Sequence, residues 1–180
     1  MKKVLLIRHG EVEARFQKRY IGWLDAALSP EGRADCARLA PEAGHPDRVF
    51  TSPLRRARET AAIVYPDRQT EFIVDDRLKE MDFGDYADLT FDEIAAQADP
   101  AWIRCWAETP ERIAFPNGES YPEFAARVDA FFRDLPDGVS AIITHGGVIM
   151  RCRGNLRGLP VRQYDDVLPA RGTLTEEILP

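Results

Sequence analysis

Short apolar runs alternate along the chain with segments of helical periodicity. Residues 4–7, 48–51 and 141–144 are typical of strands buried on both faces of a parallel sheet, and residues 72–74 form a weaker run of the same kind. Residues 173–179 alternate less cleanly and are expected to form a final edge strand.

Several helices have clear start signals. A serine followed by a proline, at 29–30 and again at 52–53, is typical of an N-cap and a first helical residue, and prolines 41 and 66 are expected to end these two helices. Two capping boxes, at 90–93 and 120–123, open further helices, and the second precedes an apolar helical face. Residues 147–156 predict another helix directly after a strand.

This alternation predicts an α/β fold with a mostly parallel central sheet, helices on both faces and right-handed crossovers. Residues 80–118 interrupt it, because they are helical in pattern, contain tryptophan and include no good strand. We interpret them as a small helical cap over the C-terminal edge of the strands, inserted into a single domain of residues 1–180.

The composition narrows the class of protein. With 24 basic and 30 acidic residues the formal net charge is −6, which argues against general nucleic-acid binding. The three cysteines are far apart and suit neither a disulfide framework nor a metal site, so reduced thiols in a cytoplasmic protein are expected. The first apolar run stops at Arg8, too short for a signal peptide, and no run approaches the ~20 residues of a membrane span. A monomer or homodimer without membrane or nucleic-acid partners is expected.

Polar residues follow three of the predicted strands, and ligands in open α/β sheets bind beyond these strand ends. Arg8 and His9 follow the first strand, Arg56 comes shortly after the second, and His145 follows the strand at 141–144. Taken singly, each has a structural explanation: a strand-end histidine is more often a hydrogen-bonded structural residue, and Arg56 or Glu80 alone would be a solvated side chain. Their joint placement at one edge of one sheet favours a site for an anion.

These residues stand in a pattern that resembles the histidine phosphatase superfamily, the phosphoglycerate-mutase-like fold. The resemblance begins with Arg8-His9-Gly10-Glu11 at the end of the first strand and continues in order to about residue 155. Its further blocks are residues 22–32, 51–61, 78–84, 116–120 and 144–148.

The resemblance implies a phosphatase, a phosphoric monoester hydrolase, that acts on a small phosphorylated substrate through a phosphohistidine. His9 is implied as the nucleophile, with Arg8, Arg56 and His145 binding the phosphoryl group and His145 protonated when substrate is bound. Ser52, as the expected start of a helix, would add partial positive charge from that helix N-terminus. No metal and no cofactor are implied.

Glu80 is implied as the general acid, and Asp82 is the alternative two residues on. Many relatives have asparagine where this chain has Arg15, which is either a secondary substrate contact or a surface residue. The remaining histidine, His45, is expected in a loop.

Among hydrolases of the superfamily, the short chain, Trp106 and the blocks at 80–85 and 116–119 are similar to α-ribazole-5′-phosphate phosphatases of cobalamin biosynthesis. The first alternative is a phosphatase of broad range or of sugar phosphates, and the second is a phosphoglycerate mutase. The last is a non-catalytic phosphate-binding module, in which loss of His9 or Glu80 would be expected.

Overall fold

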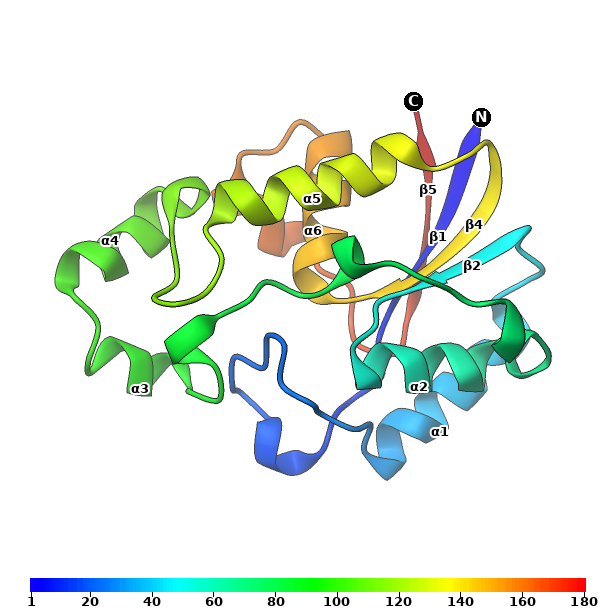
Figure 1. The fold of residues 1–180 in the computed structure, drawn as a ribbon, viewed down its shortest axis with the longest axis horizontal. Coiled ribbons are helices and arrows are strands. Elements are labelled where there is room, and N and C mark those ends of the chain that lie inside the picture. Colours follow the sequence, from blue (N-terminus) through cyan, green and yellow to red (C-terminus); the bar gives the residue numbers. More distant parts are fainter.

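One central sheet of five strands organises the chain (Figure 1). The structure is a computed structural model that describes residues 1–180, apart from the side chains of residues 68–70. The order across the sheet is β3-β2-β4-β1-β5, and all neighbours are parallel except β1 and β5. The mostly parallel sheet with a final edge strand is therefore confirmed. The strands are β1 (Lys2–Arg8), β2 (Arg48–Thr51), β3 (Ile73–Val74), β4 (Gly138–Thr144) and β5 (Leu174–Leu179).

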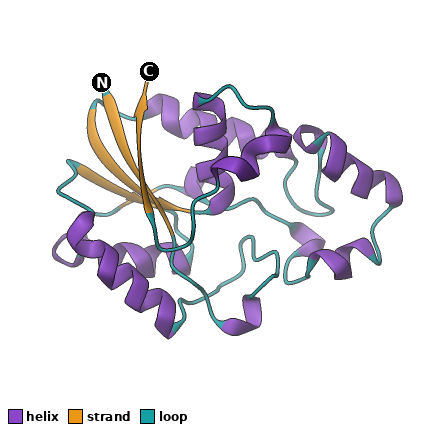
Figure 2. Ribbon diagram, turned by 180° about the vertical axis from the view of Figure 1, so that it is seen from behind, coloured by secondary structure: helices purple, strands orange, loops and turns teal.

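Helices cover both faces of this sheet, as Figure 2 shows from behind. On β1, Val4 and Leu6 belong to the apolar core beneath α5 and α6, whereas Leu5 and Ile7 belong to the core beneath α1 and α2. Successive strand residues point to opposite faces, so an uninterrupted apolar run is what a doubly covered strand requires. The α-helices are α1 (Pro30–Leu39), α2 (Arg55–Val64), α3 (Phe91–Ala95), α4 (Pro100–Glu108), α5 (Tyr121–Asp134) and α6 (Gly146–Leu156).

Seven short 3-10 helices connect these elements. None of the helices in the described chain is long and apolar enough to cross a membrane. The 3-10 helices are η1 (Ala14–Phe16), η2 (Ala40–Glu42), η3 (Pro66–Glu71), η4 (Asp76–Leu78), η5 (Gly84–Tyr86), η6 (Pro110–Arg112) and η7 (Val161–Val167).

Three of the predicted helix starts are confirmed by their caps. The Ser29 hydroxyl accepts the Gly32 N–H at 3.0 Å, and both capping boxes, at 90–93 and 120–123, are formed. The helix predicted over 147–156 is also present and begins one residue earlier, at Gly146. These starts are local, because each depends on residues within one turn of the helix.

The predicted start at Ser52 is wrong. Helix α2 begins at Arg55, and its N-cap, Leu54, makes no side-chain cap hydrogen bond. The Ser52 hydroxyl lies 2.8 Å from Nε2 of His145 and accepts the Leu54 N–H at 3.3 Å. The Ser52 hydroxyl therefore contacts His145 on the neighbouring strand end instead of capping a helix, and Ser52 is not the start of a helix at the site.

The cap of residues 80–118 contains α3, α4, η5 and η6 and no strand. Its aromatic rings pack edge to face, with Trp106 5.0 Å from Tyr20 and 5.4 Å from Phe115 between ring centroids. Gly84 has a φ of +50°, and a Cβ there would lie 2.1 Å from the Pro116 carbonyl oxygen. The two ends of the cap therefore cross at a point that only glycine permits.

Candidate active site

The carboxyl ends of neighbouring strands β1 and β4 bring two histidines together. Arg8 pairs with Thr144 in the parallel register, so His9 and His145 both lie one residue beyond their strands. Their ring centroids are 5.2 Å apart, with 4% of His9 and 0% of His145 exposed. Residues far apart in sequence thus form one buried imidazole pair.

The His9 ring is held as a neutral tautomer. Its Nδ1 lies 2.8 Å from the Gly10 carbonyl oxygen, which can only accept, so Nδ1 carries the proton and Nε2 keeps a lone pair. Burial, and next the charge of Arg56, hold the pKa of His9 well below its ordinary value of 6.5. At neutral pH, His9 therefore presents an unprotonated Nε2 able to act as a nucleophile.

The His145 ring is held by Ser52 through the 2.8 Å contact at Nε2. Its other nitrogen, Nδ1, is buried and has no hydrogen-bond partner in the described part of the chain. Burial, followed by Arg56 and His9, also lowers the pKa of His145 well below 6.5. Both rings are therefore neutral in the protein at pH 7.

Two arginines supply the positive charge that the imidazoles lack. Arg56 is 1% exposed, and it donates to the carbonyl oxygens of Gly22 at 2.7 Å and Leu24 at 3.2 Å. Burial lowers the pKa of Arg56 to about 10, so it remains charged at neutral pH. Arg8 donates to the Pro169 carbonyl oxygen at 2.7 Å. Within the described residues, the buried Nε atoms of both arginines have no partner, which leaves donors for an anion.

A third cation, Arg171, was not identified from the sequence. Gly172 donates its N–H to the carbonyl oxygens of Arg8 and His9, at 3.1 Å each, which fixes this turn beside the imidazole pair. Arg171 itself pairs with Glu11. Burial, and next the charge of Arg171, lower the pKa of Arg8, and Arg171 also adds to the lowering of the His9 pKa. The available signal was its place before the predicted edge strand, but the sequence does not show that this strand pairs with β1.

The carboxylate of Glu80 lies at the first turn of α6, against Gly147, two residues after His145. It accepts the N–H of Met81 at 3.0 Å and the N–H of Gly147 at 3.2 Å. The Glu80 main-chain oxygen accepts from Trp23 Nε1 at 2.7 Å and from Arg127 Nη2 at 2.9 Å. Glu80 is thus anchored by its own loop, by α5 and by the segment around residue 23.

Two other predicted residues have structural contacts of their own. The Asp82 carboxylate accepts the Gly84 N–H at 3.0 Å and so supports the turn into η5. The guanidinium carbon of Arg15 lies 3.8 Å from the Phe16 ring centroid, and its Nε lies 3.9 Å from Glu13. Arg15 is well exposed, so a substrate contact by this residue stays a prediction.

A cavity of about 480 Å³ adjoins Glu80 and Gly147. Aromatic side chains form much of its wall, and the charged lining residues are Glu80 and, from η7, Arg162 and Asp165. This size is within the range of small-molecule sites, and the lining residue Gly147 is two residues after His145 in the chain. The aromatic residues are Tyr20, Phe83, Trp106, Phe115, Tyr121, Phe124 and Tyr164.

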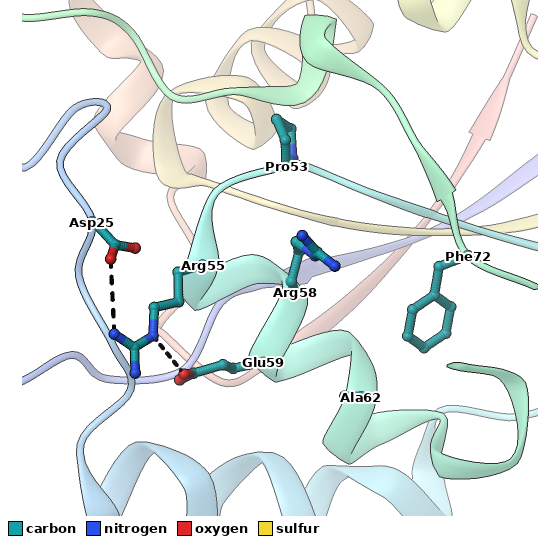
Figure 3. Close-up of a pocket in the computed structure, with 7 residues that line it drawn as sticks. All are labelled: Asp25, Pro53, Arg55, Arg58, Glu59, Ala62 and Phe72. Atoms are coloured by element: carbon teal, nitrogen blue, oxygen red, sulfur yellow. Dashed lines mark hydrogen bonds and ion pairs between the residues drawn. The ribbon is translucent and has the colours of Figure 1, made fainter. Parts of the chain in front are cut away.

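A second hollow, of about 490 Å³, lies along α2 (Figure 3). There the Arg55 guanidinium pairs with Glu59 at 2.8 Å and with Asp25 at 3.8 Å. Arg55 thus contacts the same loop, residues 22–25, whose carbonyl oxygens hold its neighbour Arg56. We assign this hollow a structural part in the site, because neither histidine of the pair lines it. It is lined by Asp25, Pro53, Arg55, Arg58, Glu59, Ala62 and Phe72.

The chain is similar to known proteins over most of its length. The model of the histidine phosphatase superfamily (branch 1) matches residues 4–176. Phosphoserine phosphatase 1 of Hydrogenobacter thermophilus is 34% identical over 137 residues, which are 75% of this chain and 64% of that protein. The chain thus spans just under two thirds of that relative's length.

Two solved structures share the fold over nearly the whole chain. The α-ribazole phosphatase from Shigella flexneri is 27% identical with a TM-score of 0.85, covering 97% of this chain and 89% of that chain. A phosphoglycerate mutase from Thermus thermophilus is 26% identical with a TM-score of 0.79, covering 97% of this chain and 91% of that chain.

Proposed function

The chain belongs to branch 1 of the histidine phosphatase superfamily, and from that premise we propose that it is a phosphatase that hydrolyses phosphomonoesters through a phosphohistidine formed on His9. The observation that carries the proposal is the buried imidazole pair, 5.2 Å between ring centroids, in which His9 keeps a free Nε2 lone pair. Arg8 and Arg56, with unpartnered buried Nε atoms in the described chain, are the donors expected to bind the phosphoryl oxygens.

In the first step, Nε2 of His9 attacks phosphorus and the bond from phosphorus to the ester oxygen breaks. The departing alkoxide takes a proton from Glu80. In the second step, Glu80 removes a proton from water, the resulting hydroxide attacks phosphorus, and the bond to Nε2 breaks. Phosphate leaves and the His9 lone pair is restored.

The charges of the site suit both steps. A phosphate dianion raises the pKa of a nearby imidazole, whereas burial and Arg56 keep the pKa of His9 low. An ion pair at 4 Å is worth about 4 kcal/mol at an effective dielectric constant of 20. Two arginines therefore supply a large part of the stabilisation of the transferring phosphoryl group.

Trapping the intermediate tests this mechanism. Protein mixed with substrate and quenched in alkaline detergent is expected to hold a phosphoryl group that survives alkali and is lost in acid. His9→Ala should abolish it, whereas His45→Ala, at an exposed loop histidine, should retain it. A stable phosphoryl group on a serine or cysteine would reject His9 as the nucleophile.

The aromatic cavity beside Glu80 supports a substrate whose alcohol carries a flat ring system. Because one solved structure with this fold is an α-ribazole phosphatase, we propose α-ribazole-5′-phosphate, whose alcohol bears a benzimidazole, as the substrate, and a role in cobalamin biosynthesis. Phosphoserine, sugar phosphates and phosphoglycerate are the alternatives.

A panel of these phosphomonoesters measures the preference. The expected result is the highest kcat/KM for α-ribazole-5′-phosphate, with Trp106→Ala reducing that preference more than the rate on sugar phosphates. Equal kcat/KM values across the panel would favour a broad-range phosphatase. A cytoplasmic location, a single domain, and a monomer or homodimer stay predictions.

A further inference from the structure

The hydroxyl of Ser52 is the buried partner of His145. Ser52 is 0% exposed and follows β2 directly, and its N–H donates to the Ile143 carbonyl oxygen at 3.0 Å. Its Oγ lies 2.8 Å from Nε2 of His145 and accepts the Leu54 N–H at 3.3 Å. The sheet and the Leu54 amide therefore fix where this hydroxyl points.

We propose that Ser52 is a positioning residue: its O–H donates to Nε2 of His145 and thereby keeps the proton of the neutral ring on Nδ1, where it is offered to the phosphoryl group. The proposal deepens the proposed phosphatase mechanism and rests on it. Ser52 acts only through His145, since the contact at Nε2 leaves Nδ1 as the ring nitrogen available to an anion.

A count of donors and acceptors selects this tautomer. Ser52 has one donor, and its oxygen already accepts from Leu54. If its O–H donates to Nε2, every polar group of Ser52 is paired, and one donor, the His145 Nδ1–H, is left for a ligand. In the opposite tautomer, Nε2–H donates to Ser52, so the hydroxyl proton and the Nδ1 lone pair are both buried without partners. Each such group costs about 1–3 kcal/mol.

In this tautomer the Nδ1–H of His145 is an uncharged hydrogen-bond donor near the cations Arg8 and Arg56. Arg8 and Arg56 disfavour a second positive charge near them, and both lower the pKa of His145. The Nδ1–H tautomer donates without that charge, whereas the Nδ1 lone pair of the other tautomer would repel a phosphoryl oxygen. Binding therefore does not need the protonated His145 that the resemblance implies for the substrate complex.

The tautomer is measured directly by NMR on protein labelled with ¹⁵N-histidine. The chain has three histidines, so His45→Gln and His145→Gln variants assign the spectrum. At pH 7, His145 is expected to show a protonated Nδ1 and an unprotonated Nε2, and Ser52→Ala is expected to convert this to a mixture or to the opposite tautomer. Nε2–H in the wild type, or an unchanged tautomer in Ser52→Ala, overturns the proposal.

Kinetics supply a second readout. Ser52→Ala is expected to lower kcat/KM for p-nitrophenyl phosphate by about 10- to 100-fold, the loss typical of residues that orient a metal-ligating histidine. The deficit should shrink as the pH falls, because protonation restores a donor at Nδ1 whatever the tautomer. Ser52→Cys, of similar volume with a weaker donor, should lie between wild type and Ser52→Ala, and a pH-independent deficit in both variants would indicate a merely structural role.

Ser140→Ala is the matched control. Ser140 is also a buried strand serine, 1% exposed, and within the described chain its hydroxyl has no hydrogen-bond partner, so kcat/KM should be unchanged. If the wild type forms a phosphohistidine but Ser52→Ala keeps the wild-type tautomer of His145 and the wild-type kcat/KM, the role of Ser52 is overturned and the proposed function is not. A tautomer that responds to Ser52 in a protein without phosphatase activity instead overturns the proposed function.

Discussion

Gly147, in the first turn of α6, lies against the carboxylate of Glu80. A Cβ at this position would be 2.4 Å from Glu80 Oε1 and 3.2 Å from a ring atom of Phe124, whereas real Cβ contacts essentially never fall below 3.0 Å. Gly147→Ala must therefore displace the carboxylate by more than half an ångström. The obstacle is the end of a flexible side chain, and alanine gains roughly 0.5–1 kcal/mol over glycine within a helix. We expect the free energy of unfolding to change little.

Catalysis should respond more strongly, because misplacing a reacting group by about 1 Å can cost about 100-fold in rate. If Glu80 protonates the leaving oxygen, kcat/KM for an alkyl phosphate should fall by about that factor in Gly147→Ala. The kcat/KM for p-nitrophenyl phosphate should change by less than about fivefold, since p-nitrophenolate departs without protonation and kcat/KM does not include the later hydrolysis of the phosphohistidine. Glu80→Gln should show the same selectivity, which ties the effect to the carboxylate.

The assay compares both substrates on wild type and Gly147→Ala, with urea unfolding of each protein as the check on folding. Equal losses on the two substrates would refute the acid role of Glu80. No loss on either would show that the carboxylate position does not matter to the chemistry.

Three further predictions concern charge and packing. The kcat/KM of Arg56→Met should fall furthest below that of the wild type at acidic pH, because removing this cation raises the pKa of His9. The ratio of wild-type to variant kcat/KM, measured from pH 5 to 8 on one substrate, cancels the ionisation of the substrate itself. A ratio that does not change with pH would contradict this role of Arg56. Both His9 and His145 have lowered pKa values in the folded protein, so on acidification their rings take up protons at a higher pH in the unfolded chain. The free energy of unfolding should therefore fall as the pH drops below 6.5, by up to about 1.4 kcal/mol per pH unit for each ring. Urea unfolding across this pH range should show a smaller pH dependence in His145→Gln. Phe131→Ala should lower the free energy of unfolding by about 3–5 kcal/mol, because Phe131 is 1% exposed and packs edge to face on the ring of Phe50. Phe91→Ala, at a site that is 45% exposed, should lower it much less in the same urea assay.

Features that depend on near neighbours could be predicted from the sequence. The run of residues 4–7 predicts a strand with two buried faces, and its alternate side chains do enter the two cores. The capping boxes at Thr90 and Ser120 form as their spacing predicts. The resemblance also implied four candidate site residues, His9, His145, Arg56 and Glu80. The sequence does not give the distances between their side chains.

Only the tertiary structure decided which strands are neighbours and what each side chain meets across them. In the order β3-β2-β4-β1-β5, the ends of β1 and β4 are neighbours, so His9 lies beside His145. The end of β2 lies next to β4, where Ser52 contacts His145 instead of capping a helix, and the turn before β5 places Arg171 near His9. Strand pairing and the burial of polar groups are settled by contacts between distant segments, where backbone hydrogen bonds and packing across the whole sheet outweigh the preference of any short stretch. Local sequence therefore determined the elements and residue types of this protein, and the sheet determined their partners.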